Sequence, residues 1–141
     1  MQNEENVVAA FFISGNTPSS KNSRVFTGTY FIPSAYTRKW IKRTKNEWAA
    51  QKIAFREALQ GITRPYYIEF TFIRKTRHRF DYINIAQAVQ DQMSYYGWIE
   101  DDDADNLKPY FGDYQYDKSN PGVIIKILKN KPKHYDNQTH P

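Results

Sequence analysis

Residues 66–96, YYIEFTFIRKTRHRFDYINIAQAVQDQMSYY, contain a strand pattern followed by a helix pattern. The first eight residues alternate, which places the side chains of odd-numbered and even-numbered positions on opposite faces and predicts a strand from Tyr66 to Ile73. From about residue 82 the apolar side chains recur at helical spacing as far as Tyr96, and Gly97 then supplies a stop signal. The stretch therefore predicts a strand, a basic connection and a helix.

The helix expected over residues 82–96 has two distinct faces at about 100° per residue. The face expected to pack on the core carries Ile85, Ala88, Val89, Gln92 and Tyr96. On a different face, Asn84, Gln87 and Asp91 lie close together. This polar face makes the helix a candidate carrier of functional side chains.

Three further elements are expected before this stretch, two strands and a long helix. Residues 7–14 (VVAAFFIS) form a short apolar run typical of a buried strand, and the turn-rich segment 15–22 follows as a loop. Residues 29–32 are consistent with another short strand that Pro33 would stop. Ser34 is then a suitable N-cap for a long helix that runs to about residue 60 before Gly61.

The long helix is expected to be amphipathic, with an apolar stripe and a basic remainder. The stripe consists of Ile41, Trp48, Phe55, Leu59 and Ile62. The basic side chains are Arg38, Lys39, Lys42, Arg43, Lys45, Lys52 and Arg56. One face would pack on the core, and the other would present positive charge.

Towards the C-terminus, residues 110–116 predict a strand with outward-facing tyrosines, and residues 123–128 predict a returning strand after the turn at 117–122. The fold class expected is α+β: a single domain with a small mixed β-sheet and two main helices packed on it. The domain would span residues 1–129. The polar residues 130–141 are expected to be a disordered tail.

Composition excludes several protein classes. The 141 residues are 40% hydrophobic and 16% aromatic, which is enough to bury the core of one domain and argues against disorder of its body. The absence of Cys excludes disulfides and thiolate zinc sites. There is no long apolar run, and acidic residues precede the first short one, so we expect neither a membrane span nor a signal peptide. A cytoplasmic protein is the expectation.

Charge is unevenly distributed along the chain. Residues 21–79 hold fourteen Lys or Arg and three Glu, whereas residues 80–120 hold two Lys and nine acidic residues. A basic block followed by an acidic block suggests a polyanion held beside a cation site. The alternative is a solvated helix face next to an acidic loop, and charge alone does not decide between them.

Residues 100–105 (EDDDAD) place five acids in six positions, and in a chain without Cys such a cluster indicates Mg²⁺ or Mn²⁺. Phosphodiester hydrolysis with these ions requires carboxylates from separate segments. Asp81 precedes the second helix, and Asp101 and Asp102 follow it. A straight helix would separate them by about 22 Å, so the acidic loop must fold back or a second chain must contribute. Alternatively, Asp81 is only a helix N-terminal acid.

Three sequence motifs resemble those of the RusA family of Holliday-junction resolvases. They are Asp81-x-x-Asn84 followed by Asp91, then Gly97-Trp98-Ile99-x-Asp101-Asp102, and the earlier loop Pro18-Ser19-Ser20-Lys21-Asn22. The family patterns are a D-x-D-N helix start with an Asp within the helix, a Gly-apolar-apolar-x-D-D ending, and a P-x-S-x-N loop after the first strand. The resemblance covers residues from about 7 to 128.

This resemblance implies a homodimer that binds four-way DNA junctions and cuts them in a Mg²⁺-dependent reaction. It also implies a role in recombination or repair and a phage or prophage origin. The family's first catalytic aspartate falls on Asp81. The aspartate of its D-D pair falls on Asp102, with Asp101 beside it, so these three are the metal ligands that the resemblance implies. The family's helix-start asparagine falls on Asn84.

The chain departs from the family pattern at two positions. Ile83 stands where the family has its second aspartate, and Gln87 stands where it has a lysine. We therefore expect either a rebuilt site, in which Asp81, Asp91 and Asp102 are the catalytic residues, or a relative that binds junction DNA without cutting it. Asp103 and Asp105 are further candidate ligands in a rebuilt site.

The basic and polar side chains near these motifs are candidate DNA contacts, because Lys and Arg neutralise phosphates without reading base sequence. The candidates are Lys21, Asn22, Arg24, Arg74, Lys75, Arg77, Arg79 and Asn84. The Lys and Arg side chains of the long helix would neutralise phosphates in the same way, and the alternative for these charges is solubility. Tyr95, Tyr96 and Trp98 are expected in the core or at a dimer interface rather than stacked on bases. A third hypothesis is a protein-interaction domain whose acidic loop binds a basic partner.

Overall fold

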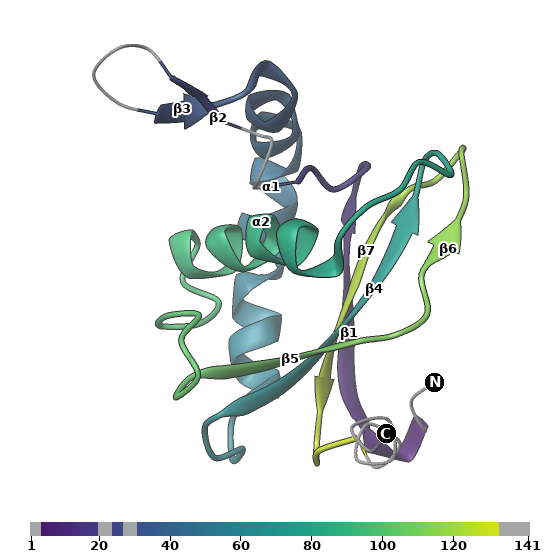
Figure 1. Ribbon diagram of the computed structural model, residues 1–141. Coiled ribbons are helices and arrows are strands. Elements are labelled where there is room, and N and C mark those ends of the chain that lie inside the picture. The colour runs from purple at the N-terminus through teal and green to yellow at the C-terminus, as the bar shows by residue number, and fades with distance from the viewer. Residues whose placement is uncertain (1–3, 20–23, 27–30, 133–141) are drawn as a thin grey trace.

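The computed structural model describes residues 4–19, 24–26 and 31–132. Two long helices and a sheet make up most of the molecule (Figure 1). In chain order the elements are η1 (Glu4–Asn6), β1 (Val7–Ser14), β2 (Arg24–Phe26), β3 (Phe31–Pro33), α1 (Ala35–Ala58), β4 (Tyr66–Arg74), α2 (Tyr82–Tyr95), β5 (Leu107–Phe111), β6 (Gln115–Tyr116) and β7 (Gly122–Leu128).

The main sheet is mixed, with the strand order β1-β7-β4-β5 and with β6 paired to β4 beyond the end of β5. β7 lies antiparallel to both β1 and β4, whereas β5 and β6 lie parallel to β4. Parallel strands need a crossover connection, and α2 provides it between β4 and β5. The α+β fold class and its two main helices are confirmed.

The core lies between the helices and one face of this sheet. The strand register aligns Phe11 of β1 with Ile125 of β7, and Ile125 with Phe70 of β4, which in turn pairs with Phe111 of β5. Ile125 and Phe70 are fully buried in the hydrophobic core, and the partly buried Phe11 and Phe111 pack against it. This alignment explains the alternation along β4, because its even-numbered residues face the helices.

The odd-numbered residues of β4 lie on the other face, and there the register places Glu69 opposite Lys126. Glu69 is only 2% exposed, and its Oε1 lies 3.9 Å from the Lys126 ammonium. The ion pair stabilises a carboxylate that would otherwise be buried without a partner.

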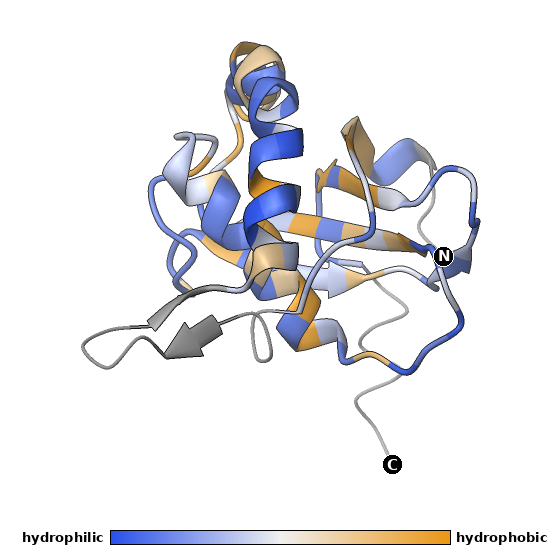
Figure 2. Ribbon diagram, turned by 90° about the horizontal axis from the view of Figure 1, so that it is seen from above, coloured by the Kyte–Doolittle hydropathy of each residue, from blue (hydrophilic) through white to orange (hydrophobic). Residues whose placement is uncertain are grey.

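Helix α1 begins and ends close to the predicted positions. The Ser34 hydroxyl accepts a hydrogen bond from the Thr37 amide at 3.3 Å, as an N-cap does, and Gly61 follows the helix with φ 82°. Trp48 and Phe55 are fully buried. Figure 2 displays the resulting alternation of hydrophilic and hydrophobic residues along α1.

The prediction of one strand over residues 110–116 is wrong in its bounds, because the structure has two short strands, β5 and β6. The chain bends at Gly112, whose amide donates to the Phe70 carbonyl at 3.0 Å. A Cβ at this position would come within 2.6 Å of the Thr71 hydroxyl, so only glycine allows the close approach. This bend separates the two pairings with β4.

The predicted strand at 29–32 is also displaced. Strand β3 includes Pro33 instead of stopping before it, and it pairs with β2, which sequence reasoning missed. Thr29 and Tyr30 lie outside the described residues, as do residues 133–141 of the predicted tail. No helix within the described ranges has both the length and the apolar character needed to span a membrane.

Candidate functional site

The loop after α2 is anchored in the core by Trp98. Its side chain is completely buried, and its indole N–H donates to the Trp48 carbonyl at 2.9 Å. Its backbone amide donates to the Met93 carbonyl, also at 2.9 Å. Gly97, with φ 74°, makes the turn that leads from α2 into Trp98. Trp98 therefore fixes the position of the chain where the acidic residues begin.

Three of the acidic side chains in this loop serve its local structure. Glu100 lies 3.0 Å from the Arg64 guanidinium, and Asp101 accepts the backbone amide of Asp102 at 2.8 Å. Asp103 accepts two backbone amides, of Asp105 and Asn106, and the Asn106 side chain. These contacts stabilise the turns of the loop.

Asp102 instead reaches the polar face of α2. The Gln87 side-chain amide donates to Asp102 Oδ2 at 3.0 Å and to Asp91 Oδ1 at 2.7 Å. We call these three residues the acidic cluster. The expectation that the loop folds back along the helix is confirmed by this contact, and so is the shared face of Gln87 and Asp91. Two carboxylates from separate segments thus meet at one amide nitrogen.

Asp81 is the N-cap of α2, and its Oδ1 accepts the Ile83 amide at 2.9 Å. Asp81 therefore acts as a helix N-terminal acid, and its role as a metal ligand stays a prediction. Six residues separate it from Gln87, which corresponds to about 9 Å along a helix axis, instead of the 22 Å or so that separates the two ends. Within the described ranges, no three or more His, Cys, Asp or Glu residues gather in a way that could hold a metal ion. The ligand set of Asp81, Asp101 and Asp102 stays a prediction.

The two positions that depart from the family pattern differ in surroundings. The Ile83 side chain is 72% exposed at the start of α2 and contributes no polar atom. Gln87 holds the acidic cluster together through a neutral amide. Asn84 is half-buried on the same helix, between these two positions.

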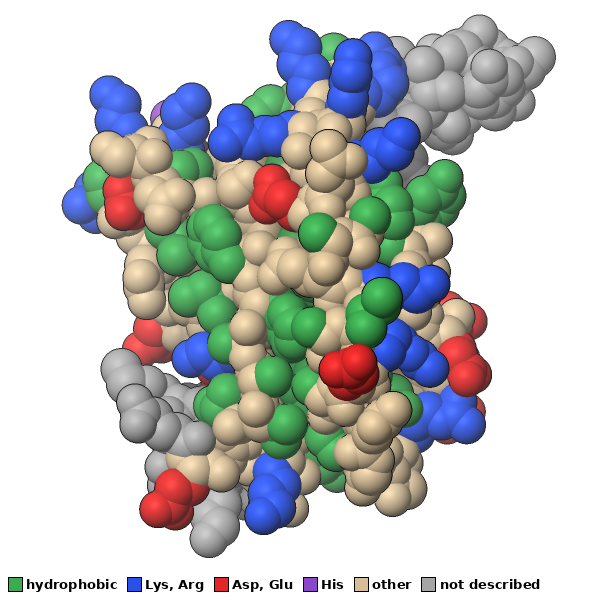
Figure 3. Space-filling view, turned by 180° about the vertical axis from the view of Figure 1, so that it is seen from behind, with side chains coloured by type: hydrophobic (Ala, Val, Ile, Leu, Met, Phe, Trp, Pro, Cys, Tyr) green, Lys and Arg blue, Asp and Glu red, His purple; other side chains and the backbone are tan. Residues whose placement is uncertain are grey.

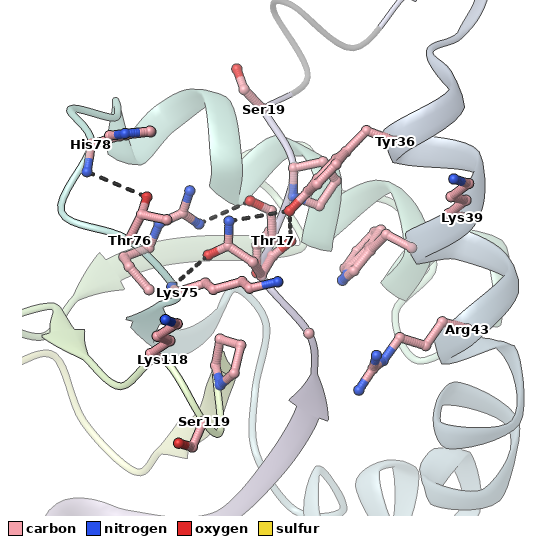
Figure 4. A pocket seen from close by; sticks show the side chains of 16 residues that line it. Thr17, Ser19, Tyr36, Lys39, Arg43, Lys75, Thr76, His78, Lys118 and Ser119 are labelled. Atoms are coloured by element: carbon pink, nitrogen blue, oxygen red, sulfur yellow. Dashed lines mark hydrogen bonds between the residues drawn. The ribbon is translucent and has the colours of Figure 1, made fainter.

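A second candidate site is a cavity of about 730 Å³ between α1 and the ends of β1, β4 and β7 (Figure 4). Residues 15–19, 36–43, 74–78 and 118–121 contribute its lining. Its basic side chains are Lys39, Arg43, Arg74, Lys75, His78 and Lys118, and no Asp or Glu of the described segments lines it. In Figure 3, Lys and Arg gather at the end of the molecule where α1 begins and β4 ends. We call this feature the basic cavity.

Asn16 ties three walls of the basic cavity together. Its side-chain oxygen accepts the Lys75 amide at 2.9 Å, and its side-chain nitrogen donates to the Tyr36 hydroxyl at 3.1 Å. The Tyr36 hydroxyl in turn donates to the Asn16 carbonyl at 2.8 Å. The loop after β1, the first turn of α1 and the end of β4 are therefore held in one arrangement.

Arg74 holds the loop after β1 at a second point. Its guanidinium donates to the Thr17 carbonyl at 2.9 Å and lies 4.8 Å from the centre of the Phe80 ring. Burial lowers the pKa of the Arg74 guanidinium, and the nearby Tyr36 opposes this shift. Arg74 is thus a wall residue of the basic cavity with a structural contact of its own.

The structure describes only some of the other predicted DNA contacts in full. Lys21 and Asn22 lie outside the described residues, and only the backbone of Arg24 is described, in β2. The Arg77 guanidinium lies 4.2 Å from the centre of the Tyr116 ring, and Arg79 is exposed.

Among the lining residues, sequence reasoning did not select Tyr36 or Lys118, and it counted Lys39 and Arg43 only among the basic side chains of the long helix. Lys39 and Arg43 had a signal, because they lie four residues apart and therefore share a face of α1. No pattern in the sequence indicated Lys118, because only the folded chain brings the 117–122 turn next to α1.

A comparison of the sequence with protein-family models finds no match, and a comparison with curated proteins finds none either. The resemblance to the RusA family therefore depends on the motifs in residues 18–22 and 81–102.

Proposed function

We propose that this protein is RusA-like: it binds branched DNA, four-way junctions in particular, and hydrolyses phosphodiester bonds there with Mg²⁺ or Mn²⁺. The observation that carries the proposal is the contact of Gln87 with both Asp91 and Asp102. These carboxylates come from α2 and from the acidic loop, the two segments that carry the resemblance. Convergence of carboxylates from separate segments is what metal-dependent hydrolysis requires.

The donor set fits a divalent cation of this kind. Mg²⁺ usually keeps several waters and binds one or two carboxylates together with substrate phosphates. Asp91 and Asp102 would hold the ion, with Asp81 and Asp101 as the further ligands that the sequence predicts. A bound ion would activate water and neutralise charge on the leaving oxygen. Gln87 positions Asp91 and Asp102 relative to each other.

Binding of DNA is supported by the cationic side chains of the basic cavity and of the connection after β4. Lys39, Arg43, Lys75 and Lys118 are exposed, and no carboxylate within the described part of the chain is ion-paired with them. Such side chains release counterions when they meet phosphates, so binding should weaken steeply as salt rises. A branched substrate is recognised by its shape more than by its bases.

The test is incubation of a labelled four-way junction with the protein and Mg²⁺, Mn²⁺ or a chelator. We expect cleavage only with metal. Asp102→Asn should lower the cleavage rate by about 100-fold or more, since a metal contributes several kcal/mol at the transition state. The matched control, Asp113→Asn, removes an exposed carboxylate outside the acidic cluster and should leave the rate unchanged. Equal rates for the two variants would contradict the proposal.

The rebuilt site has a separate test. Asp81→Asn and Asp91→Asn should both lower cleavage while junction binding persists. If Asp91→Asn leaves cleavage untouched and Asp81→Asn abolishes it, Asp91 is not part of the site.

A second candidate function is junction binding without cleavage. It is favoured by Ile83, which offers no ligand, and by Gln87, which carries no charge. This candidate predicts tight, salt-sensitive junction binding and no product with either metal. An interaction domain that binds a basic protein partner predicts no junction binding even at low salt.

We also propose that the protein acts as a homodimer. The sheet face away from the helices carries the half-buried side chains Phe12 and Ile124, which the register places next to each other. Light scattering should give the mass of two 16.7 kDa chains. Ile124→Asp should shift that mass towards one chain, and a single-chain mass for the unaltered protein would contradict the dimer.

A further inference from the structure

The wall of the basic cavity contains two buried donors without acceptors. Thr17 is 1% exposed and Trp40 is 4% exposed. Neither the Thr17 hydroxyl nor the Trp40 indole N–H has a hydrogen-bond partner among the described residues. Buried polar groups are almost always paired, and an indole N–H can only donate. Both residues line the cavity, so a small shift of its wall would let them donate to an acceptor bound there.

The charges around the cavity indicate that this acceptor belongs to an anion. Figure 4 shows Arg43 extending from α1 and Lys75 extending from the opposite wall towards the same space. Lys118 approaches from the turn before β7. Because no carboxylate of the described chain lines the cavity, these cations have no internal counter-charge there. A phosphate would supply it.

Tyr36 adds a flat aromatic surface at the same place. Its side chain is 53% exposed, yet its hydroxyl is held by two hydrogen bonds to Asn16. A ring that is fixed and still accessible is suited to stacking against a nucleic-acid base, which is a sequence-independent contact.

The size of the cavity restricts what can enter it. A volume of about 730 Å³ is typical of a small-molecule site. One helical turn of duplex DNA is about 34 Å long, so paired DNA can lie across the mouth but cannot enter. A single nucleotide, with one phosphate and one base, can enter the cavity.

We propose that the basic cavity binds one unpaired nucleotide of a DNA strand, with its phosphate among the cations and its base against Tyr36. This proposal rests on the proposed DNA-binding function and adds a specific subsite to it. The subsite is separate from the acidic cluster, because neither Gln87 nor its two aspartates line the cavity. It would select branched DNA whose strands carry unpaired positions.

The first experiment measures fluorescence anisotropy of a labelled oligothymidylate with the full chain. Tyr36→Ala should weaken binding by about 5- to 150-fold, the range expected for loss of one base–aromatic stack. Tyr36→Phe keeps the ring but loses the two hydrogen bonds that fix it, so its affinity should lie between those of the unaltered protein and Tyr36→Ala. Thermal unfolding of each variant separates loss of the stack from loss of the fold.

Tyr95→Ala is the comparison variant, because Tyr95 is 79% exposed on α2 and does not line the cavity. It should bind oligothymidylate as the unaltered protein does. The proposal is wrong if Tyr95→Ala weakens binding as much as Tyr36→Ala, or if Tyr36→Ala weakens binding to a fully paired duplex by the same factor.

Competition identifies the source of the phosphate. Thymidine monophosphate should displace the labelled strand at lower concentration than inorganic phosphate, because only the nucleotide offers a base to Tyr36. Equal competition by the two would mean that the base contributes nothing and would overturn the proposal. Arg43→Ala should also reduce the slope of log affinity against log salt by about 0.7, one phosphate contact of a single strand.

The outcomes separate this proposal from the proposed function. If the protein binds a four-way junction tightly but its affinity for oligothymidylate does not depend on Tyr36, the cavity proposal fails and the function stands. If Tyr36-dependent oligothymidylate binding is present but a four-way junction binds no better than a duplex, the cavity proposal stands and the function fails.

Discussion

The acidic cluster and the basic cavity are built in opposite ways. The acidic cluster lies within sixteen consecutive residues, from Gln87 to Asp102, on one helix and the loop that follows it. The basic cavity draws on four segments between Gly15 and Pro121. The cluster depends on the loop being anchored beneath it, whereas the cavity depends on hydrogen bonds that join distant segments. Different substitutions should therefore damage each.

The largest effect should come from the anchor of the acidic loop. Trp98→Ala removes a completely buried ring that packs on Phe55 and Trp48, and we expect a loss of about 3–5 kcal/mol in the free energy of unfolding. Denaturant unfolding measures it. Tyr95→Ala, at an exposed position nearby, should change the stability by no more than about 0.5 kcal/mol. A loss below about 1 kcal/mol for Trp98→Ala would contradict the anchor.

The next effect should come from the tie between the cavity walls. Asn16→Ala removes the side-chain bonds to the Lys75 amide and the Tyr36 hydroxyl, which should cost about 1–2 kcal/mol. Amide hydrogen exchange at Lys75 should also accelerate. Asn46→Ala, on the exposed side of α1, is the matched control and should do neither. Unchanged exchange at Lys75 would show that Asn16 does not hold the walls.

A smaller effect is expected within the acidic cluster. Gln87→Glu replaces the shared donor by a third carboxylate, so the metal-free protein should lose about 1 kcal/mol of stability through like-charge repulsion. Mg²⁺ should restore it, because an ion that binds only the folded state stabilises that state. Thermal unfolding with Mg²⁺ and with chelator measures both. Gln87→Ala, which adds no charge, should gain less from Mg²⁺. Equal Mg²⁺ dependence for the two variants would argue against an ion at this cluster.

The smallest effect on stability should come from the rim of the cavity. Arg43→Ala should leave the free energy of unfolding within about 0.5 kcal/mol, because the side chain is exposed. The salt slope of junction binding should nevertheless fall by about 0.9 for each duplex phosphate that this cation neutralises. Lys108→Ala, at an exposed position of β5 away from the cavity, should keep the slope. If both variants change the slope equally, the cavity contributes only net charge.

Local patterns predicted much of this molecule. The bounds of α1 and α2 follow from apolar spacing, from Ser34 as a cap and from glycine stops, all of which act within one or two turns. The division of the β4 side chains between two faces also followed from alternation. The pairing of β2 with β3 and the break at Gly112 did not, because both depend on strands or side chains distant in the sequence.

The same distinction applies to the two sites. The proximity of Gln87 and Asp91 follows from their spacing of four residues on one helix. The approach of Asp102 to the helix was one of two alternatives, the other being a second chain that completes the site. The place of Tyr36 in a cavity wall was not predicted, since its partner Asn16 belongs to a loop twenty residues earlier.

The walls of the basic cavity are joined largely through main-chain atoms: the Lys75 amide and the carbonyls of Asn16 and Thr17. The rim cations Lys39 and Lys118 take no part in these joints. The charges at the rim can therefore change during evolution without loss of the hydrogen bonds that join the walls. Homologues should retain an asparagine at position 16 more faithfully than any single lysine around the opening, and their substrate preference should diverge without loss of the fold.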